Sequence, residues 1–295
     1  MRVCLVQVPY HLGHRSVRLG LGPARYMEHG ADRTLREQGH DVRVQTVQSE
    51  GLGQHEIGAT FALNKLLAER VGQLVQQQRF PLVLAGDCNS CLGTLAGLTG
   101  SEVGLVWFDA HGDFNTPATT MSGFFDGMAL AAATGNCWKE MAAQIPHFRP
   151  VREDLALLVG VRALDPKEKE LLEGSRVSVV RAESLKRAGI RAGLAPALNA
   201  LKHRVRQVYL HIDMDVLDPA EAPANDYVVP GGLTLGELEQ AIRLIAQHFT
   251  LRAAALTAFD PTCDKENKTV DAGLHLMSVI VEAAGHKCHE TQLSG

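Results

Sequence analysis

Eight short apolar runs rich in β-branched residues recur along the chain, with helical patterns between them. Most of these runs are continuously apolar rather than alternating, which is typical of strands that are covered on both faces. The runs lie at residues 3–8, 41–47, 81–86, 103–108, 155–161, 177–180, 207–213 and 253–259. The clearest helical patterns lie at residues 59–78, 166–174, 194–205, 234–249 and 269–285. This arrangement predicts an α/β fold in which helices flank a parallel sheet of about eight strands.

The sequence gives no sign of a division into several domains. Neither an internal repeat nor a low-complexity tract nor a charged linker interrupts the chain, so we expect residues 1–295 to form one domain. Hydrophobic residues make up 45% and charged residues 21%, which is enough apolar material for a sizeable core. Thr234 followed by Glu237 has the spacing of a capping box and predicts a helix start there.

Charge and cysteine content exclude several classes of partner. The net charge is −4 and the 29 Lys and Arg residues are scattered, which argues against nucleic acid or an anionic membrane as a partner. No apolar run approaches the roughly 18–20 residues of a membrane span. The first residues lack the apolar stretch and cleavage site of a signal peptide. The six cysteines include one C-x-x-C pair, Cys88 and Cys91, without the partners of a zinc motif, so we expect reduced thiols in a cytoplasmic protein.

Polar side chains follow three of the predicted strands at the point where each strand ends. They are Asp87, Cys88 and Asn89 after 81–86, Asp109, His111 and Asp113 after 103–108, and Asp213 and Asp215 at the end of 207–213. In folds of this class, ligands bind beyond the carboxyl ends of the strands. Alternation within 109–113 would direct all three side chains to one side of an extended chain.

Two pairs of carboxylates on neighbouring strands would repel each other strongly without a counter-charge. A pair of divalent cations removes this repulsion and is also suited to forming hydroxide from water at neutral pH. Oxygen-rich ligands with one imidazole favour manganese or a similar metal over a structural zinc. The sequence therefore predicts a metal site with two ions, against the alternative of acidic helix caps exposed to solvent.

Several motifs together resemble the arginase (ureohydrolase) family. These are "DAHGDFNT" followed by "TTMSG", "HIDMDVLDP", "GDCNS" and "GPARYMEHG", which occur in the family's order over nearly the whole chain. The resemblance implies a three-layer α/β/α sandwich with a central, mostly parallel sheet of about eight strands. It also implies a dinuclear manganese centre that hydrolyses guanidino groups.

The resemblance implies roles for individual residues. Asp109, His111, Asp113, Asp213 and Asp215 match metal ligands, with Asp109 and Asp213 at the bridging positions; Asp113 is also assigned as catalytic. Asn115, Thr120 and Ser122 match residues that bind the α-carboxylate of an amino acid, and Asp165 matches one that binds its α-amino group. For Asn115 the alternative is a turn residue before Pro117, and for Asp165 it is a helix cap.

A first departure from the family pattern is Cys88, which stands where the family has a metal-binding histidine in "GGDHS". A thiolate can bind a divalent metal, but soft sulfur is a poor ligand for manganese. We therefore expect weaker binding at this position, or a preference for iron, cobalt or zinc. The alternative is a thiol beside the site, with water as the missing ligand.

A second departure is Asp126 in "SGFFDGM", which aligns with the family's proton-carrying histidine. A carboxylate can move protons if its surroundings raise its pKa. The alternative is a solvated aspartate of a loop. The neighbouring Phe124 replaces a polar residue that contacts the head group of the substrate in arginases.

A third departure concerns the end of "ALTAFDPT", where Ala258 replaces a glutamate that faces the substrate guanidinium. Burying a guanidinium without a carboxylate costs several kcal/mol, by order of magnitude. Asp260 lies two residues further on and could take the place of the glutamate if the strand continues. A less basic substrate such as Nω-hydroxy-L-arginine avoids this cost, and a branch of the family that hydrolyses it also carries a cysteine at the position of Cys88.

We therefore predict a metal-dependent hydrolase that cleaves a C–N bond of a guanidino amino acid. Nω-hydroxy-L-arginine is the first candidate substrate, and L-arginine or a shorter or longer guanidino acid is the second. A non-catalytic homologue that binds metal or a guanidino ligand is the alternative of a different class. Two Mn²⁺ ions, or another divalent metal, are the expected cofactors. The number of subunits is left open by the sequence.

Overall fold

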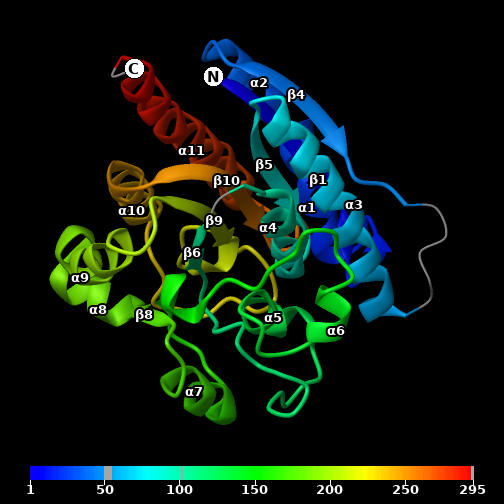
Figure 1. Ribbon diagram of the computed structural model, residues 1–295, viewed down its shortest axis with the longest axis vertical. Coiled ribbons are helices and arrows are strands. Elements are labelled where there is room, and N and C mark those ends of the chain that lie inside the picture. The colour runs from blue at the N-terminus through cyan, green and yellow to red at the C-terminus, as the bar shows by residue number, and fades with distance from the viewer. Residues whose placement is uncertain (50–54, 101, 294–295) are drawn as a thin grey trace.

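A sheet of eight strands forms the centre of the computed structural model (Figure 1), which describes residues 1–49, 55–100 and 102–293, with side chains up to residue 285. The strands are β1 (Arg2–Val8), β4 (Asp41–Thr46), β5 (Phe80–Ala85), β6 (Gly104–Phe108), β7 (Ala156–Val161), β8 (Ser178–Arg181), β9 (Gln207–Asp213) and β10 (Thr250–Thr257). Their order is β4-β1-β5-β10-β9-β6-β7-β8 and every neighbouring pair is parallel. Each strand overlaps one of the predicted runs, so the predicted parallel sheet is confirmed. A separate antiparallel hairpin joins β2 (Tyr10–His11) to β3 (His14–Arg15).

Helices cover both faces of this sheet and complete a three-layer sandwich. They are α1 (Gly22–Glu28), α2 (Ala31–Glu37), α3 (Glu56–Gln76), α4 (Cys91–Gly97), α5 (Ala129–Ala133), α6 (Lys139–Ala142), α7 (Pro166–Glu173), α8 (Ala182–Ala188), α9 (Ile190–Lys202), α10 (Leu235–His248) and α11 (Lys268–Leu293). Helix α4 packs between α3 and α5, whereas α11 packs against α1, α2 and α10. The five predicted helical patterns correspond to α3, α7, α9, α10 and α11. The other helices are too short to give a periodic pattern.

Among the described residues, five short 3₁₀ helices lie at turns and strand ends. They span Arg18–Leu21, Cys88–Ser90, Asp126–Met128, Glu153–Leu155 and Met214–Val216. Three of them carry polar residues that the sequence singled out, namely Cys88, Asp126 and Asp215. The first turns after β5 and β9 are therefore tight, and they keep these side chains close to the strand ends.

The strands are buried because helices cover both faces. Every residue of β5, β6 and β7 is buried, in agreement with their continuous apolar sequences. None of the five cysteines with described side chains forms a disulfide, and Cys288 lies outside the described side chains. Within the described part of the chain, no helix is long and apolar enough to cross a membrane.

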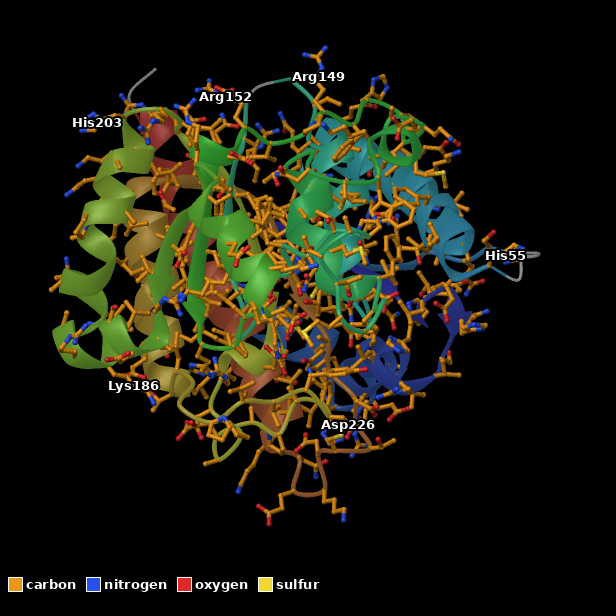
Figure 2. All side chains as sticks on the ribbon, turned by 90° about the horizontal axis from the view of Figure 1, so that it is seen from below. His55, Arg149, Arg152, Lys186, His203 and Asp226 are labelled. Atoms are coloured by element: carbon orange, nitrogen blue, oxygen red, sulfur yellow. The ribbon has the colours of Figure 1, made fainter. Side chains whose placement is uncertain are left out.

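The parallel sheet places all carboxyl ends of its strands at one end of the molecule. Arg149 and Arg152 precede β7, whereas Asp226 follows β9, and Figure 2 shows them at opposite ends. In the same view Lys186 of α8 and His203 lie on one side and His55, before α3, on the other. Residues that follow the strands therefore gather at the end marked by Asp226.

Gly86 fixes the start of the turn after β5. A Cβ atom built there would lie 2.1 Å from the Tyr10 carbonyl oxygen and 2.8 Å from the Gly20 nitrogen. Only glycine permits this approach of three backbone segments. The close packing brings the next residue, Asp87, against the hairpin that begins at Tyr10, where its carboxylate accepts a hydrogen bond from the Leu12 amide (2.7 Å).

The predicted capping box at the start of α10 is confirmed. The Thr234 hydroxyl accepts a hydrogen bond from the Glu237 amide (3.2 Å), and the Glu237 carboxylate accepts one from the Thr234 amide (2.9 Å). Both bonds satisfy amide groups that the first helical turn leaves without a partner. The cap therefore stabilises a helix that packs against α9 and α11.

We expect Thr234→Ala to lower the free energy of unfolding by about 1 kcal/mol, because it removes the side-chain acceptor of this cap. Urea denaturation of the wild type and the variant measures the difference. Thr234→Ser keeps the hydroxyl and serves as the control, with most of the stability retained. An equal loss in both variants would contradict a contribution from the hydrogen bond.

Candidate active site

Four adjacent strands bring the predicted site residues together. Strands β5, β10, β9 and β6 are neighbours in the sheet, and their carboxyl ends carry Cys88, Ala258, Asp213 and Asp109, respectively. The order of the strands in the sheet differs from their order in the sequence. Segments far apart in the chain therefore meet at one point because parallel strands align their ends.

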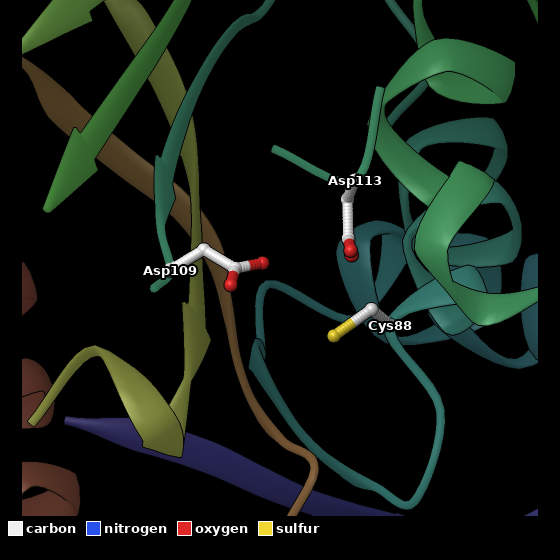
Figure 3. Close-up of side chains that lie close together, drawn as sticks. All are labelled: Cys88, Asp109 and Asp113. Carbon is white, nitrogen blue, oxygen red and sulfur yellow. The ribbon is translucent and has the colours of Figure 1, made fainter. Parts of the chain in front are cut away.

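The side chains of Cys88, which follows β5, and of Asp109 and Asp113, which both follow β6, point toward one another (Figure 3). Their potential ligand atoms lie within 4.8 Å of one another. A second group with the same spacing consists of Asp109, His111 and Asp215. Asp109 belongs to both groups, so the two groups are adjacent, and each of them could hold a metal ion.

Asp213 connects these two groups. Its Oδ2 atom lies 3.1 Å from the Cys88 Sγ atom, and its Oδ1 atom accepts a hydrogen bond from the Asp215 amide (2.9 Å). Both predicted bridging carboxylates, Asp109 and Asp213, are therefore central to the arrangement. All six predicted ligands lie at this one site.

The segment after β6 is not extended, contrary to the expectation from alternation. Asp113 has a φ angle of 47°, in the left-handed region that is uncommon for residues other than glycine. His111 and Asp113 consequently fall into different ligand groups, although both approach Asp109. Strain of this kind is often found at functional sites.

Burial and mutual repulsion dominate the electrostatics of the carboxylates. Burial, followed by the charge of Asp215, raises the pKa of Asp109 and that of Asp213. Burial and the charge of Asp109 raise the pKa of Asp113 well above its usual range. The Asp113 carboxylate has no hydrogen-bond partner within the described residues. These side chains are thus costly to ionise together unless a cation is present.

His111 lies between two of these carboxylates. Its Nδ1 atom is 3.2 Å from Asp215 Oδ2 and 3.4 Å from Asp109 Oδ1. Burial lowers the pKa of His111, but the hydrogen bonds to Asp109 and Asp215 outweigh it and raise the pKa to about 12. A positive charge is therefore strongly favoured between these carboxylates, which is the property of a site suited to a cation. Oxygen, imidazole and sulfur donors are all ligands of divalent transition metals.

Arg162 holds the turn after β9, a role that sequence reasoning missed. Its Nη2 atom donates to the carbonyl oxygens of Asp215 (2.6 Å) and Leu217 (3.2 Å), and its Nε atom donates to that of Val229 (2.9 Å). The guanidinium group thereby fixes the backbone that carries Asp215. A lone arginine after a strand gives no sequence signal for this contact.

A network of aromatic and polar side chains supports the site from inside the sheet. The Trp107 ring stacks on His211 with 3.6 Å between ring centroids, and its Nε1 atom donates to Asp109 Oδ2 (2.8 Å). Burial lowers the pKa of His211 to about 3, so this ring is neutral. Thr257 of β10 links His211 to Cys88. The sequence gives no signal for these cross-strand contacts.

Asp126 is buried, so the alternative of a solvated loop aspartate is wrong. It is 5% exposed, and its carboxylate accepts hydrogen bonds from the amides of Cys88 (3.0 Å) and Asn89 (2.9 Å) and from the Asn89 side chain. Burial and the charge of Asp87 raise the pKa of Asp126 well above its usual range. Asp126 thus anchors the turn that carries Cys88 and also lines the cavity described next.

A cavity of about 700 Å³ opens above the two ligand groups. It includes all four predicted substrate-binding residues, Asn115, Thr120, Ser122 and Asp165, together with Phe124 and Asp126. Sequence reasoning missed four further polar residues of its wall, which are Glu56, Glu168, Asn225 and Tyr227. Its volume is typical of sites for small molecules.

Two of the predicted substrate-binding residues contact each other. The Asn115 Nδ2 atom donates to Asp165 Oδ2 (3.1 Å), and Asn115 Oδ1 accepts from the Thr119 hydroxyl (3.0 Å). Asp165 also begins α7 in a capping box with Glu168, whose carboxylate accepts from the Asp165 amide (3.1 Å). The helix-cap alternative for Asp165 is therefore compatible with its position in the cavity wall.

Ala258 lines the cavity, but Asp260 does not. Ala258 has a φ angle of 61°, so the strand ends at Thr257 and its alternation does not continue. The Asp260 Oδ1 atom instead accepts hydrogen bonds from the amide (2.9 Å) and hydroxyl (2.7 Å) of Thr262. The continuing strand that would let Asp260 take the place of the missing glutamate is therefore not present.

The comparisons with known proteins agree with this geometry. A family model described as "Arginase family" matches residues 1–282. The arginase of Bacillus caldovelox is 31% identical, with 94% of this chain and 97% of that protein covered. The arginase of Brevibacillus brevis is 30% identical, covering 94% of this chain and 96% of its own.

A solved structure titled as native arginase from Bacillus caldovelox at pH 5.6 has the same fold. It superposes with a TM-score of 0.86 at 31% sequence identity and covers 96% of this chain and 98% of its own. The match of sequence, fold and site order extends over nearly the whole length. The chain therefore belongs to the Arginase family.

Proposed function

We propose that this protein is a metal-dependent hydrolase that cleaves a C–N bond of a guanidino amino acid, with Nω-hydroxy-L-arginine as the preferred substrate. The observation that carries the proposal is the pair of ligand groups that share Asp109 at the base of a 700 Å³ cavity, whose wall carries Ala258 in place of an acidic residue. Membership of the Arginase family supports the reaction class. The composition supports a cytoplasmic enzyme whose partner is a small molecule rather than nucleic acid or a membrane.

The proposed metal ligands are the five residues of the two groups together with Asp213, which connects them. The full set is Cys88, Asp109, His111, Asp113, Asp213 and Asp215. Two Mn²⁺ ions, or another divalent metal, fit this donor set, although sulfur is a better ligand for iron, cobalt or zinc. When bound, the ions supply hydroxide from water at neutral pH. Hydrolysis then requires water to add to the guanidino carbon, and the C–N bond to the departing amine to break.

The remaining roles fall to side chains of the cavity. Asn115, Thr120, Ser122 and Asp165 are proposed to hold the α-carboxylate and α-amino groups of the substrate. Asp113, whose carboxylate has no protein partner within the described residues, would hold a proton of the attacking water. Asp126, with a pKa raised by burial and by Asp87, would pass that proton to the leaving amine.

The proposed preference for a neutral substrate rests on the lack of a negative charge at Ala258 in the cavity wall. Ala258 supplies no carboxylate, and its carbonyl oxygen accepts a hydrogen bond from the buried Asn225 amide (2.8 Å). A guanidinium held there would lack the paired charge that burial demands. An Nω-hydroxyguanidine is less basic and enters the site as the neutral form. L-arginine is the second candidate, because the similar proteins are named arginases.

A panel of guanidino compounds tests the proposed reaction directly. The manganese-loaded protein should release hydroxyurea from Nω-hydroxy-L-arginine, and more slowly urea from L-arginine. Absence of turnover with every compound and every divalent metal would favour a non-catalytic homologue that binds metal or a guanidino ligand.

We expect Asp213→Ala to abolish activity and the retention of at least one metal ion, because this carboxylate connects the two ligand groups. Metal content after dialysis, measured by plasma mass spectrometry, checks the prediction. Asp226→Ala serves as the control, since Asp226 is exposed and pairs with Arg18 outside the cavity. A full complement of metal in Asp213→Ala would contradict the bridging role.

Substitutions of Cys88 test whether its sulfur binds metal. Cys88→His should raise the affinity for Mn²⁺, because imidazole is a better ligand for this ion than a thiolate. Cys88→Ser should lower the occupancy of one position only. Calorimetric titration with Mn²⁺ measures both, and Cys91→Ser is the matched control because Cys91 is buried outside the ligand groups. Equal affinities in all four proteins would exclude a ligand role.

Ala258→Glu should raise kcat/KM for L-arginine relative to Nω-hydroxy-L-arginine, because it provides a carboxylate for the guanidinium. We expect a change in the ratio of about tenfold or more, which corresponds to about 1.4 kcal/mol. Ala258→Gln has the same size without the charge and should leave the ratio nearly unchanged. A wild type that already prefers L-arginine strongly would disprove the argument from charge.

A further inference from the structure

A chain of buried polar side chains leads from the interior of the sheet to the Cys88 sulfur. The Tyr209 hydroxyl lies 2.9 Å from His211 Nδ1, His211 Nε2 lies 3.2 Å from the Thr257 hydroxyl, and that hydroxyl lies 3.1 Å from Cys88 Sγ. All four side chains are at most 1% exposed. Burial of so many polar atoms is costly unless each has a hydrogen-bond partner.

The His211 ring at the middle of this chain is held rigidly. His211 and Thr257 lie on the neighbouring parallel strands β9 and β10, and Trp107 of β6 stacks on the ring at an interplanar angle of 11°. The same Trp107 donates to the Asp109 carboxylate. The ring therefore connects, through one neighbour each, two of the proposed metal ligands.

The Thr257 hydroxyl has one hydrogen and can therefore donate to only one of its neighbours at a time. A neutral imidazole has one donor and one acceptor nitrogen. If Tyr209 donates to His211 Nδ1, then Nε2 carries the hydrogen and donates to the Thr257 oxygen. The single Thr257 hydrogen is then left for one of two acceptors, the Ile212 carbonyl oxygen at 3.3 Å or the Cys88 sulfur.

The contacts of the Cys88 sulfur show why the direction of the Thr257 hydroxyl hydrogen matters. Within the described residues, the two polar groups at hydrogen-bond distance from Cys88 Sγ are the Asp213 carboxylate and the Thr257 hydroxyl. A cysteine that binds metal is a thiolate, which accepts hydrogen bonds. An ionised carboxylate cannot donate one, so Thr257 is left as the side chain able to donate to a Cys88 thiolate.

We propose that Thr257 is a positioning residue for Cys88. Its hydroxyl, oriented by His211, fixes the direction of the sulfur and turns from the Ile212 carbonyl to donate to the sulfur when Cys88 binds metal. This proposal rests on the assignment of Cys88 as a ligand in the proposed function. A valine would fill the same volume, so packing alone does not explain a buried hydroxyl here. Groups that orient metal ligands commonly change metal affinity by 10–100-fold.

The test compares Thr257→Val, which removes the hydroxyl at nearly constant volume, with Thr257→Ser, which keeps it. In Co²⁺-loaded wild type and Thr257→Ser, a thiolate-to-cobalt absorption band that is absent from Cys88→Ser should appear in the near ultraviolet. Thr257→Val should shift this band and weaken the binding of one Co²⁺ by about 10–100-fold. An unchanged band and affinity in Thr257→Val would overturn the proposal.

A measurement on the metal-free protein separates this proposal from the ligand assignment. The infrared S–H stretch of Cys88, identified by its loss in Cys88→Ser, should shift in Thr257→Val and stay in place in Thr257→Ser. A wild type without the cobalt band would refute Cys88 as a ligand, and the S–H stretch would then decide the positioning role alone.

If Thr257→Val does not fold, Tyr209→Phe removes the donor that orients His211 and should shift the same S–H band. An S–H stretch that is unchanged in the folded variant would overturn the positioning role.

Discussion

Repulsion among four buried aspartates is the interaction on which the rest of this structure depends. Asp109, Asp113, Asp213 and Asp215 meet at the ends of β6 and β9, each at most 8% exposed. Burial and their neighbours raise the pKa of three of them, and only Asp215, hydrogen-bonded to His111, has a lowered pKa. Such a cluster persists because the surrounding fold forces it and because a cation can neutralise it.

The fold supplies that constraint through rigid strands and anchored turns. Gly86 permits the close packing behind the turn of Cys88, and Asp126 holds the same turn from the other side through backbone amides. Arg162 fixes the turn of Asp215 through carbonyl oxygens. A site that is pre-arranged in this way loses little free energy to reorganisation when it binds a ligand.

The proposed substrate preference arises from changes of single side chains within the fold of the family. The family fold is retained over nearly the whole chain, with a TM-score of 0.86 to an arginase structure. The departures are concentrated at Cys88, Asp126 and Ala258, which all lie at the same cavity or its base. In the proposed function, their joint effect is a softer metal ligand at Cys88 and a cavity wall whose Ala258 supplies no carboxylate for a guanidinium.

Sequence alone determined the eight parallel strands and the residues that follow them, because continuous apolar runs and strand-end carboxylates are local patterns. It also determined the capping box at Thr234, which needs only a spacing of three residues. Only the tertiary structure decided that His111 and Asp113 belong to different ligand groups and that Asp260 does not line the cavity. Both outcomes depend on left-handed φ angles at Asp113 and Ala258, which packing imposes against local preference. Likewise, the contacts of Thr257, His211 and Trp107 arise from the order of strands in the sheet, which the chain's own order does not reveal.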